Sequence, residues 1–169
     1  FRGVLPQPRS VWNFYRDIAV LAFPVPPSER DRWEDAAPSA QADVPNFKGA
    51  ALFDGNPETL VRLPRPAPRE TTALTITLAR PFVARTLELA IQTGRGSEDV
   101  AVWAGDTLDT LRRVADVQIP AQLPVTKPYA IVCEPFTARV VRLLFRTPPR
   151  ERIPSAIPLA EVRLSGGRR

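Results

Sequence analysis

Hydrophobic and polar residues alternate along several short stretches of the chain, as they do in β-strands that bury one face. Residues 74–78 show the pattern most cleanly, with leucine and isoleucine on one side and threonine on the other. Turn-forming residues follow many of these stretches, for example at 94–97 and 105–106. Short strands at this spacing predict an all-β protein, a sandwich or barrel of antiparallel sheets. The predicted strands are residues 74–78, 87–91, 100–104, 114–119, 129–133, 140–146 and 159–164.

The N-terminal part shows a different pattern. The stretch from Asp17 to Phe23 is apolar on both alternating faces, which predicts a strand that needs cover on both sides. Residues 29–35 follow a Ser-x-x-acid helix start and predict one or two helical turns. We therefore divide the chain into residues 1–45, a strand and short helical segment that packs on the sandwich or on a neighbouring domain, and residues 46–169, the sandwich.

Composition supports the all-β prediction and removes several enzyme classes. Twenty prolines among 169 residues disfavour long helices. The chain has no histidine, so Ser-His-Asp and Cys-His catalysis are excluded, and its one cysteine, Cys133, lies in an apolar run typical of a core position. No apolar run is long enough to span a bilayer, so we expect no membrane partner. The chain contains no methionine and begins at Phe1, which suggests a piece of a longer protein.

The net charge of +5 raises a polyanion as a partner. However, the basic residues are scattered along strands and loops, as Arg139, Arg142 and Arg146 illustrate, and do not form a stripe interleaved with stacking aromatic residues. We therefore expect a solvated basic surface and no nucleic-acid partner, and we keep polyanion binding as a third functional hypothesis.

A turn rich in oxygen donors follows the apolar pair Leu52-Phe53. Residues 54–59 read Asp-Gly-Asn-Pro-Glu-Thr, which brings a carboxylate, an amide oxygen and a hydroxyl into one tight turn. Such oxygens suit calcium, which takes six to eight oxygen ligands. The alternative is an Asx turn, in which Asp54 and Asn56 hydrogen-bond only to their own backbone.

Three segments carry a resemblance to a known fold. Residues 136–143 resemble the Ala-Arg-x-x-Arg-Leu strand of discoidin-like, galactose-binding-like β-sandwiches, residues 159–166 resemble the closing strand, and residues 53–59 resemble the early Asp-Gly-Asn-x-x-Thr turn. The resemblance covers residues 46–166 and implies an antiparallel jelly-roll β-sandwich. It also implies a structural calcium ion. Its ligands would be Asp54, Asn56, Thr59 and Glu161, unless Glu161 simply pairs with a surface arginine.

A second resemblance concerns residues 15–24, Tyr-Arg-Asp-Ile-Ala-Val-Leu-Ala-Phe-Pro. This stretch is similar to one found in α-L-rhamnosidases of glycoside hydrolase family 106, where it precedes a β-sandwich insertion in a catalytic barrel. The similarity implies an accessory domain of a bacterial glycoside hydrolase, secreted or periplasmic, whose partner is the catalytic barrel of the parent protein. It also implies that the catalytic carboxylates lie elsewhere in the parent.

Two functions follow for the domain itself, because independent catalysis is disfavoured by the loop and turn contexts of its acidic residues. The reading that we favour is a structural domain that packs against the catalytic barrel. The alternative is a carbohydrate-binding module, in which an aromatic platform holds a sugar and polar groups fix its hydroxyls. The candidate residues for the alternative are Trp103, Asp106, Trp33 and Tyr129.

Overall fold

The computed structural model describes residues 33–67, 70–94, 96–146 and 156–166, all of which belong to one unit, Trp33–Arg169. The predicted strand at 17–23 and most of the predicted helix at 29–35 lie outside these residues. The described elements are η3 (Trp33–Ala36), β1 (Ser39–Ala42), η4 (Gly49–Phe53), β2 (Val61–Pro64), β3 (Thr71–Ile91), β4 (Glu98–Gly105), η5 (Leu108–Thr110), β5 (Arg112–Ile119), β6 (Tyr129–Arg146) and β7 (Ala156–Ser165), where η denotes a short 3₁₀-helix.

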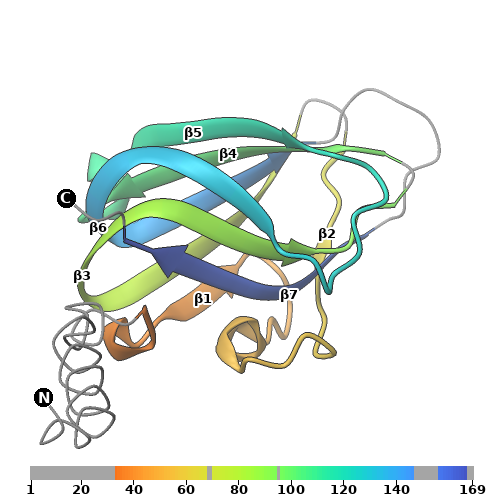
Figure 1. Cartoon of the computed structure of the whole chain (residues 1–169), viewed down its shortest axis with the longest axis horizontal. Coiled ribbons are helices and arrows are strands. Elements are labelled where there is room, and N and C mark those ends of the chain that lie inside the picture. Colours follow the sequence, from red (N-terminus) through yellow and green to blue (C-terminus); the bar gives the residue numbers. More distant parts are fainter. Residues whose placement is uncertain (1–32, 68–69, 95, 147–155, 167–169) are drawn as a thin grey trace, which may run out of the picture. The chain divides into compact units, whose positions relative to one another are not determined.

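Two long strands, β3 and β6, run through the whole fold (Figure 1). Their halves at residues 71–77 and 140–146 pair with each other and are flanked by β1 on one side and by β4 and β5 on the other. Their other halves, at residues 82–91 and 129–138, also pair, and there β7 and then β2 extend the sheet. All pairings are antiparallel, so the two halves form the two layers of a β-sandwich joined by shared strands.

The core lies between the two layers and explains the alternation in the sequence. Leu74, Ile76, Leu143 and Phe145 point inward from the first layer and are fully buried, as are residues of the second layer such as Leu87. Burial of each side chain of this kind contributes about 1.5–3 kcal/mol. The prediction of an all-β antiparallel jelly-roll sandwich is therefore confirmed.

The strand boundaries differ from the prediction in an informative way. The predicted strands at 74–78 and 87–91 are parts of β3, and those at 129–133 and 140–146 are parts of β6. The backbone of β3 stays extended across the intervening residues, and its register against β6 shifts between Thr77 and Phe82, so the strand passes from one half of the fold to the other without ending. The short strands β1 and β2 were not predicted. β1 lies in residues 1–45, the part that the sequence analysis separates from the sandwich.

The 3₁₀-helix η4 lies against β1, β2 and β7 and thereby fixes the start of the Asp54 turn. Gly49 makes this packing close, since a Cβ atom at this position would lie 2.0 Å from the carbonyl oxygen of Ala40 on β1. Only glycine therefore permits the approach. In the turn at Asp54 that follows η4, Gly55 adopts a φ of +70°, which lies in the left-handed region that glycine favours.

A buried ion pair ties the connection between β2 and β3 to the start of β4. The guanidinium of Arg65 donates to both carboxylate oxygens of Glu98, with Nη1 2.7 Å from Oε2, and the two side chains are 7% and 1% exposed. Burial raises the pKa of Glu98, outweighing the hydrogen bond and the charge of Arg65, which lower it. Arg65 therefore favours the ionised form of Glu98, whereas burial favours the protonated form.

Among the described residues, no helix is long and apolar enough to cross a membrane.

Candidate functional site

The outer face of the first layer carries a row of side chains centred on Trp103. Trp103 on β4 is in register with Arg142 on β6 and with Arg113 on β5, and Arg142 is in turn in register with Thr75 on β3. Residues directly opposite each other on antiparallel strands project to the same side, with Cβ atoms about 4.5–5.5 Å apart. Four neighbouring strands thus place an indole, two guanidinium groups and a hydroxyl side by side.

Two nitrogen atoms in this row lack hydrogen-bond partners. Within the described ranges, the Nε1 atom of Trp103 and the Nε atom of Arg142 are buried and have no partner. The indole nitrogen can only donate, and so can the guanidinium nitrogen. Because leaving a buried donor unsatisfied costs about 1–3 kcal/mol, this pair of adjacent donors marks a place where an acceptor would stabilise the fold.

Ionic side chains cover the same face beyond the row. The carboxylate of Asp116 on β5 accepts from Arg113 at 3.1 Å and from Arg146 at 3.3 Å, and Gln118 donates to Asp99 at 3.1 Å. These groups are largely exposed, so each contact contributes at most about 1 kcal/mol to stability. They make this face polar and charged.

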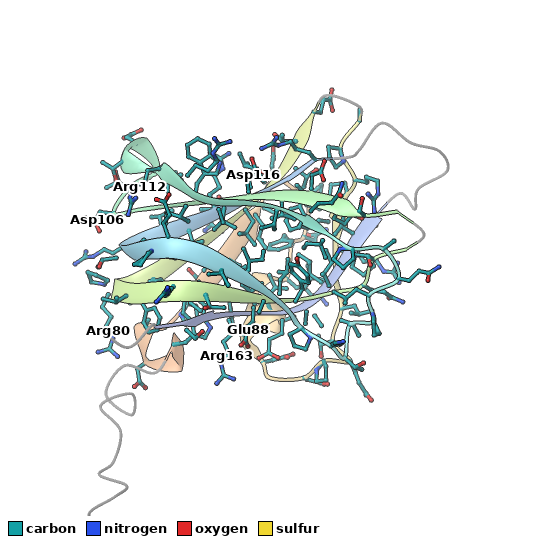
Figure 2. All side chains as sticks on the ribbon, turned by 45° about the horizontal axis from the view of Figure 1, so that its top comes forward. Arg80, Glu88, Asp106, Arg112, Asp116 and Arg163 are labelled. Carbon is teal, nitrogen blue, oxygen red and sulfur yellow. The ribbon has the colours of Figure 1, made fainter. Side chains whose placement is uncertain are left out.

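Asp106 lies at the end of the sandwich, in the turn after β4, and its side chain is exposed. Figure 2 shows it at the same end as Arg112, whereas Asp116 lies further along β5. The 3₁₀-helix η5 that follows is held by Thr107, whose hydroxyl and backbone N–H both contact the hydroxyl of Thr110. Asp106 therefore lies directly after the C-terminal end of β4, three residues beyond Trp103.

The other two aromatic candidates lie away from this face. Trp33 is only 5% exposed and packs edge to face against Phe53 and Phe82, with ring centroids 5.9 and 5.8 Å apart. It therefore serves as a core residue in this structure, because a sugar platform needs an open ring face. Tyr129 begins β6 in the second layer, in register with Leu89, and packs partly against the core. The structure therefore does not bring the four candidate residues together.

The turn at Asp54 has the hydrogen bonds of an Asx turn. The backbone N–H of Asn56 donates to Oδ1 of Asp54 at 2.8 Å, and that of Glu58 donates to Oδ1 of Asn56 at 3.0 Å. These two bonds are those that the Asx-turn interpretation predicts, and each oxygen retains a second lone pair, so they do not decide between that interpretation and a calcium site. The side chains of Asp54 and Asn56 are exposed, and that of Thr59 is half-buried.

Glu161, the fourth predicted calcium ligand, lies on β7 opposite Ala90 and is half-buried. Because η4 contacts β7, the turn that follows η4 begins near the strand that carries Glu161. The described residues contain no group of three or more His, Cys, Asp or Glu side chains that could hold a metal. The donor set fits calcium by its hard oxygens but includes only two carboxylates, and calcium binding remains a prediction.

Cys133 occupies a core position on β6. It is 4% exposed, and burial raises the pKa of its thiol. A buried thiol of raised pKa is a poor nucleophile, because the thiolate is the reactive form. The structure therefore supports the core role that the sequence predicts for Cys133.

Sequence reasoning singled out Trp103 but not its neighbours in the row. Arg113, Thr75 and Arg142 lie 10, 28 and 39 residues from it in the chain, and strand register brings them together. The alternation within each strand predicts which of its residues share a face. It does not predict which strands lie next to each other in the sheet.

Comparison with known proteins identifies the fold. No family model matches the chain, and no curated protein matches it. Among solved structures, the chain is similar to CBM32-3 from a family 31 glycoside hydrolase from Clostridium perfringens, with a TM-score of 0.63 and 12% identity over 82% of this chain and 97% of that one.

Two further structures show the same likeness. One is the CBM32 of AlyQ in complex with 4,5-unsaturated mannuronic acid, with a TM-score of 0.61 and 15% identity over 76% of this chain and 95% of that one. The other is a pectin-binding carbohydrate-binding module, with a TM-score of 0.59 and 9% identity over 77% of this chain and 91% of that one. The described domain therefore has the β-sandwich fold of these carbohydrate-binding modules.

Proposed function

We propose that this domain is a non-catalytic carbohydrate-binding module attached to a carbohydrate-active enzyme. The observation that carries the proposal is the similarity to carbohydrate-binding modules, which this chain covers over more than nine tenths of their length. One of them comes from a glycoside hydrolase, which supports a catalytic domain as the partner in the parent protein. This favours the carbohydrate-binding alternative over the purely structural role.

The sheet face around Trp103 supplies groups that such a role needs. A half-buried indole offers an apolar surface for a pyranose ring, and flanking arginine and threonine side chains offer hydrogen bonds to its substituents. Asp106, exposed at the end of β4, is the remaining polar candidate near this face. We infer that Trp103 is the main aromatic contact.

A glycan array tests this function. The purified domain is applied at physiological ionic strength, where the Debye length of about 8 Å suppresses loose charge attraction. We expect binding to a defined set of glycans and its loss in Trp103→Ala. Leu108→Ala is a matched control, because Leu108 is an exposed hydrophobic residue on η5 outside the row and its loss should leave binding unchanged. An empty array with a folded protein would refute the proposal.

A structural role beside a catalytic domain is the second candidate. It is favoured by two exposed valines in the second layer, Val132 on β6 and Val83 on β3, which are 69% and 53% exposed. A glycoside hydrolase family 106-like parent and a secreted or periplasmic location belong to the same proposal, and they rest on the resemblance of residues 15–24 alone. Co-purification of the domain with a separately expressed catalytic domain of the parent, weakened by Val132→Asp, would support this role.

A further inference from the structure

Arg142 differs from the other arginines on the outer face of the first layer. Arg113 and Arg146 share the carboxylate of Asp116, and Asp99 accepts from Gln118. Arg142 makes no ion pair within the described part of the chain, and its Nε atom lacks any hydrogen-bond partner there. Among the described residues, no carboxylate therefore pairs with the guanidinium of Arg142 on this face.

The residue directly opposite Arg142 also has a buried nitrogen without a hydrogen-bond partner among the described residues. Trp103 lies in register with Arg142 on the adjacent strand, and its Nε1 atom also has no partner among the described residues. Both groups donate hydrogen bonds and neither accepts one. A neutral hydroxyl can satisfy one such donor, whereas a carboxylate offers about four lone-pair sites and a negative charge.

We propose that this face binds the carboxylate of an acidic sugar, with Arg142 and Trp103 as its donors, so that the ligand is a uronate-containing glycan. The inference rests on the proposed carbohydrate-binding function and adds the chemical class of its ligand. Guanidinium groups recognise carboxylates through their planar fork, and such charge-assisted hydrogen bonds are about twice as strong as neutral ones.

The dimensions of the row suit a short oligosaccharide. Thr75, Arg142, Trp103 and Arg113 lie on four successive strands, and adjacent strands are about 4.8 Å apart, so the row spans roughly 14 Å. A chain lying across the strands would meet Arg142 and Trp103 at the middle of the row, Thr75 at one end and Arg113 at the other. Two arginines in one row favour more than one acidic sugar unit.

Access to the site requires a side chain to move. The unpartnered nitrogens of Trp103 and Arg142 are shielded from solvent, so the ligand carboxylate must displace a neighbouring group. Arg113 can move, since its side chain is 57% exposed and is held by one 3.1 Å contact with Asp116. Asp116 is then an internal competitor, because its carboxylate already accepts from Arg113, which the ligand would use.

Titration of the whole chain with a galacturonate oligosaccharide, and in parallel with its methyl ester, tests the inference. The ester keeps the sugar rings but lacks the carboxylate charge. Binding is followed by the indole N–H resonances of the tryptophans in a proton–nitrogen correlation spectrum, in which Trp103→Phe identifies the signal of Trp103. We expect the acid to shift this signal and to bind at least about tenfold more tightly than the ester.

Variants then separate the site from general charge attraction. Arg142→Met is expected to weaken acid binding by about tenfold or more, whereas Arg62→Met, an exposed arginine on β2 in the other layer, should leave it unchanged. Asp116→Asn should tighten acid binding severalfold, because it removes the competing carboxylate. A variant that merely perturbed folding would not give that gain.

The outcomes distinguish this inference from the proposed function. If the chain binds neutral glycans and the galacturonate ester as tightly as it binds the acid, the inference is wrong and the proposed function stands. The same holds if Arg142→Met binds the acid as tightly as the wild type does. A Trp103 signal that does not move at a saturating concentration of the acid likewise overturns it. If neither acidic nor neutral glycans bind at all, both the inference and the proposed function fail.

Discussion

The Arg65–Glu98 ion pair gives the sharpest prediction about stability. Arg65→Met removes the charge but keeps much of the length of the side chain, so Glu98 is left in a site where it is 1% exposed. Removing one partner of a buried ion pair costs about 3–5 kcal/mol, since the remaining charge has neither water nor a counter-ion. For a domain of this size we expect the melting temperature to fall by roughly 6–20 °C at about pH 7.

The loss should depend on pH in a defined direction. Burial already raises the pKa of Glu98 from its ordinary value of 4.5, and losing Arg65 removes the groups that lower it. Between that ordinary value and the raised pKa, the folded variant holds a proton that the unfolded chain has released, so stability falls as the pH rises. The deficit of Arg65→Met relative to the wild type should thus be largest near neutral pH and shrink as the pH falls toward 4.5.

The assay is urea unfolding followed by tryptophan fluorescence at a series of pH values. Adding Glu98→Gln to Arg65→Met should recover much of the lost stability at about pH 7, because the unpaired charge is gone. The matched control is Arg112→Met, whose partner Glu134 lies 3.5 Å away and is 73% exposed, and its loss should cost less than about 1 kcal/mol at every pH. The reasoning is refuted if Arg65→Met lies within about 0.5 kcal/mol of the wild type, or if its deficit does not change with pH.

Three further predictions address packing, reactivity and metal binding. Gly49→Ala should destabilise the domain by more than about 2 kcal/mol in urea unfolding, because the new Cβ would lie 2.0 Å from the carbonyl oxygen of Ala40, and a loss below about 0.5 kcal/mol would mean that η4 is loosely held. The thiol of Cys133 should react with a thiol reagent only after unfolding, since it is buried and its pKa is raised, so rapid labelling in native buffer would contradict the core position. Calcium added to the EDTA-treated protein should raise its melting temperature, and Asp54→Ala should abolish this increase; if calcium has no effect, the calcium prediction should be dropped.

Sequence patterns predicted the fold well wherever one strand face meets the core. Alternation at 74–78 and 100–104 correctly indicated strands, and these lie within β3 and β4. Sequence could not reveal that β3 continues through Pro81, because whether a polar stretch bends or ends a strand depends on the partner across the sheet. The short strand β1 was missed for the same reason, since its pairing with β3 defines it.

The candidate site was predictable only in part. Trp103 was identified because an aromatic residue near a turn is a common sugar contact, and it lies on the face that the inference uses. Trp33 has the same residue type, yet the structure places it in the core, and its local sequence gives no sign of the difference. Arg142 is one of many arginines in the sequence, and only the register between β4 and β6 shows that it stands opposite Trp103, with no ion pair to another described residue.

The pairing of β3 with β6 also determines how the chain must fold. Residue 71 pairs with residue 146, and residue 89 pairs with residue 129, so both layers depend on contacts between distant parts of the sequence. Closing such loops costs entropy before the contacts stabilise anything, and proteins rich in non-local pairs fold in milliseconds to seconds. The β4–β5 hairpin is local and can form early, but neither layer is complete until β6 has been synthesised. A nascent or truncated chain that ends before residue 129 would therefore expose the inner edge of β3, and aggregation of such fragments is the expected result.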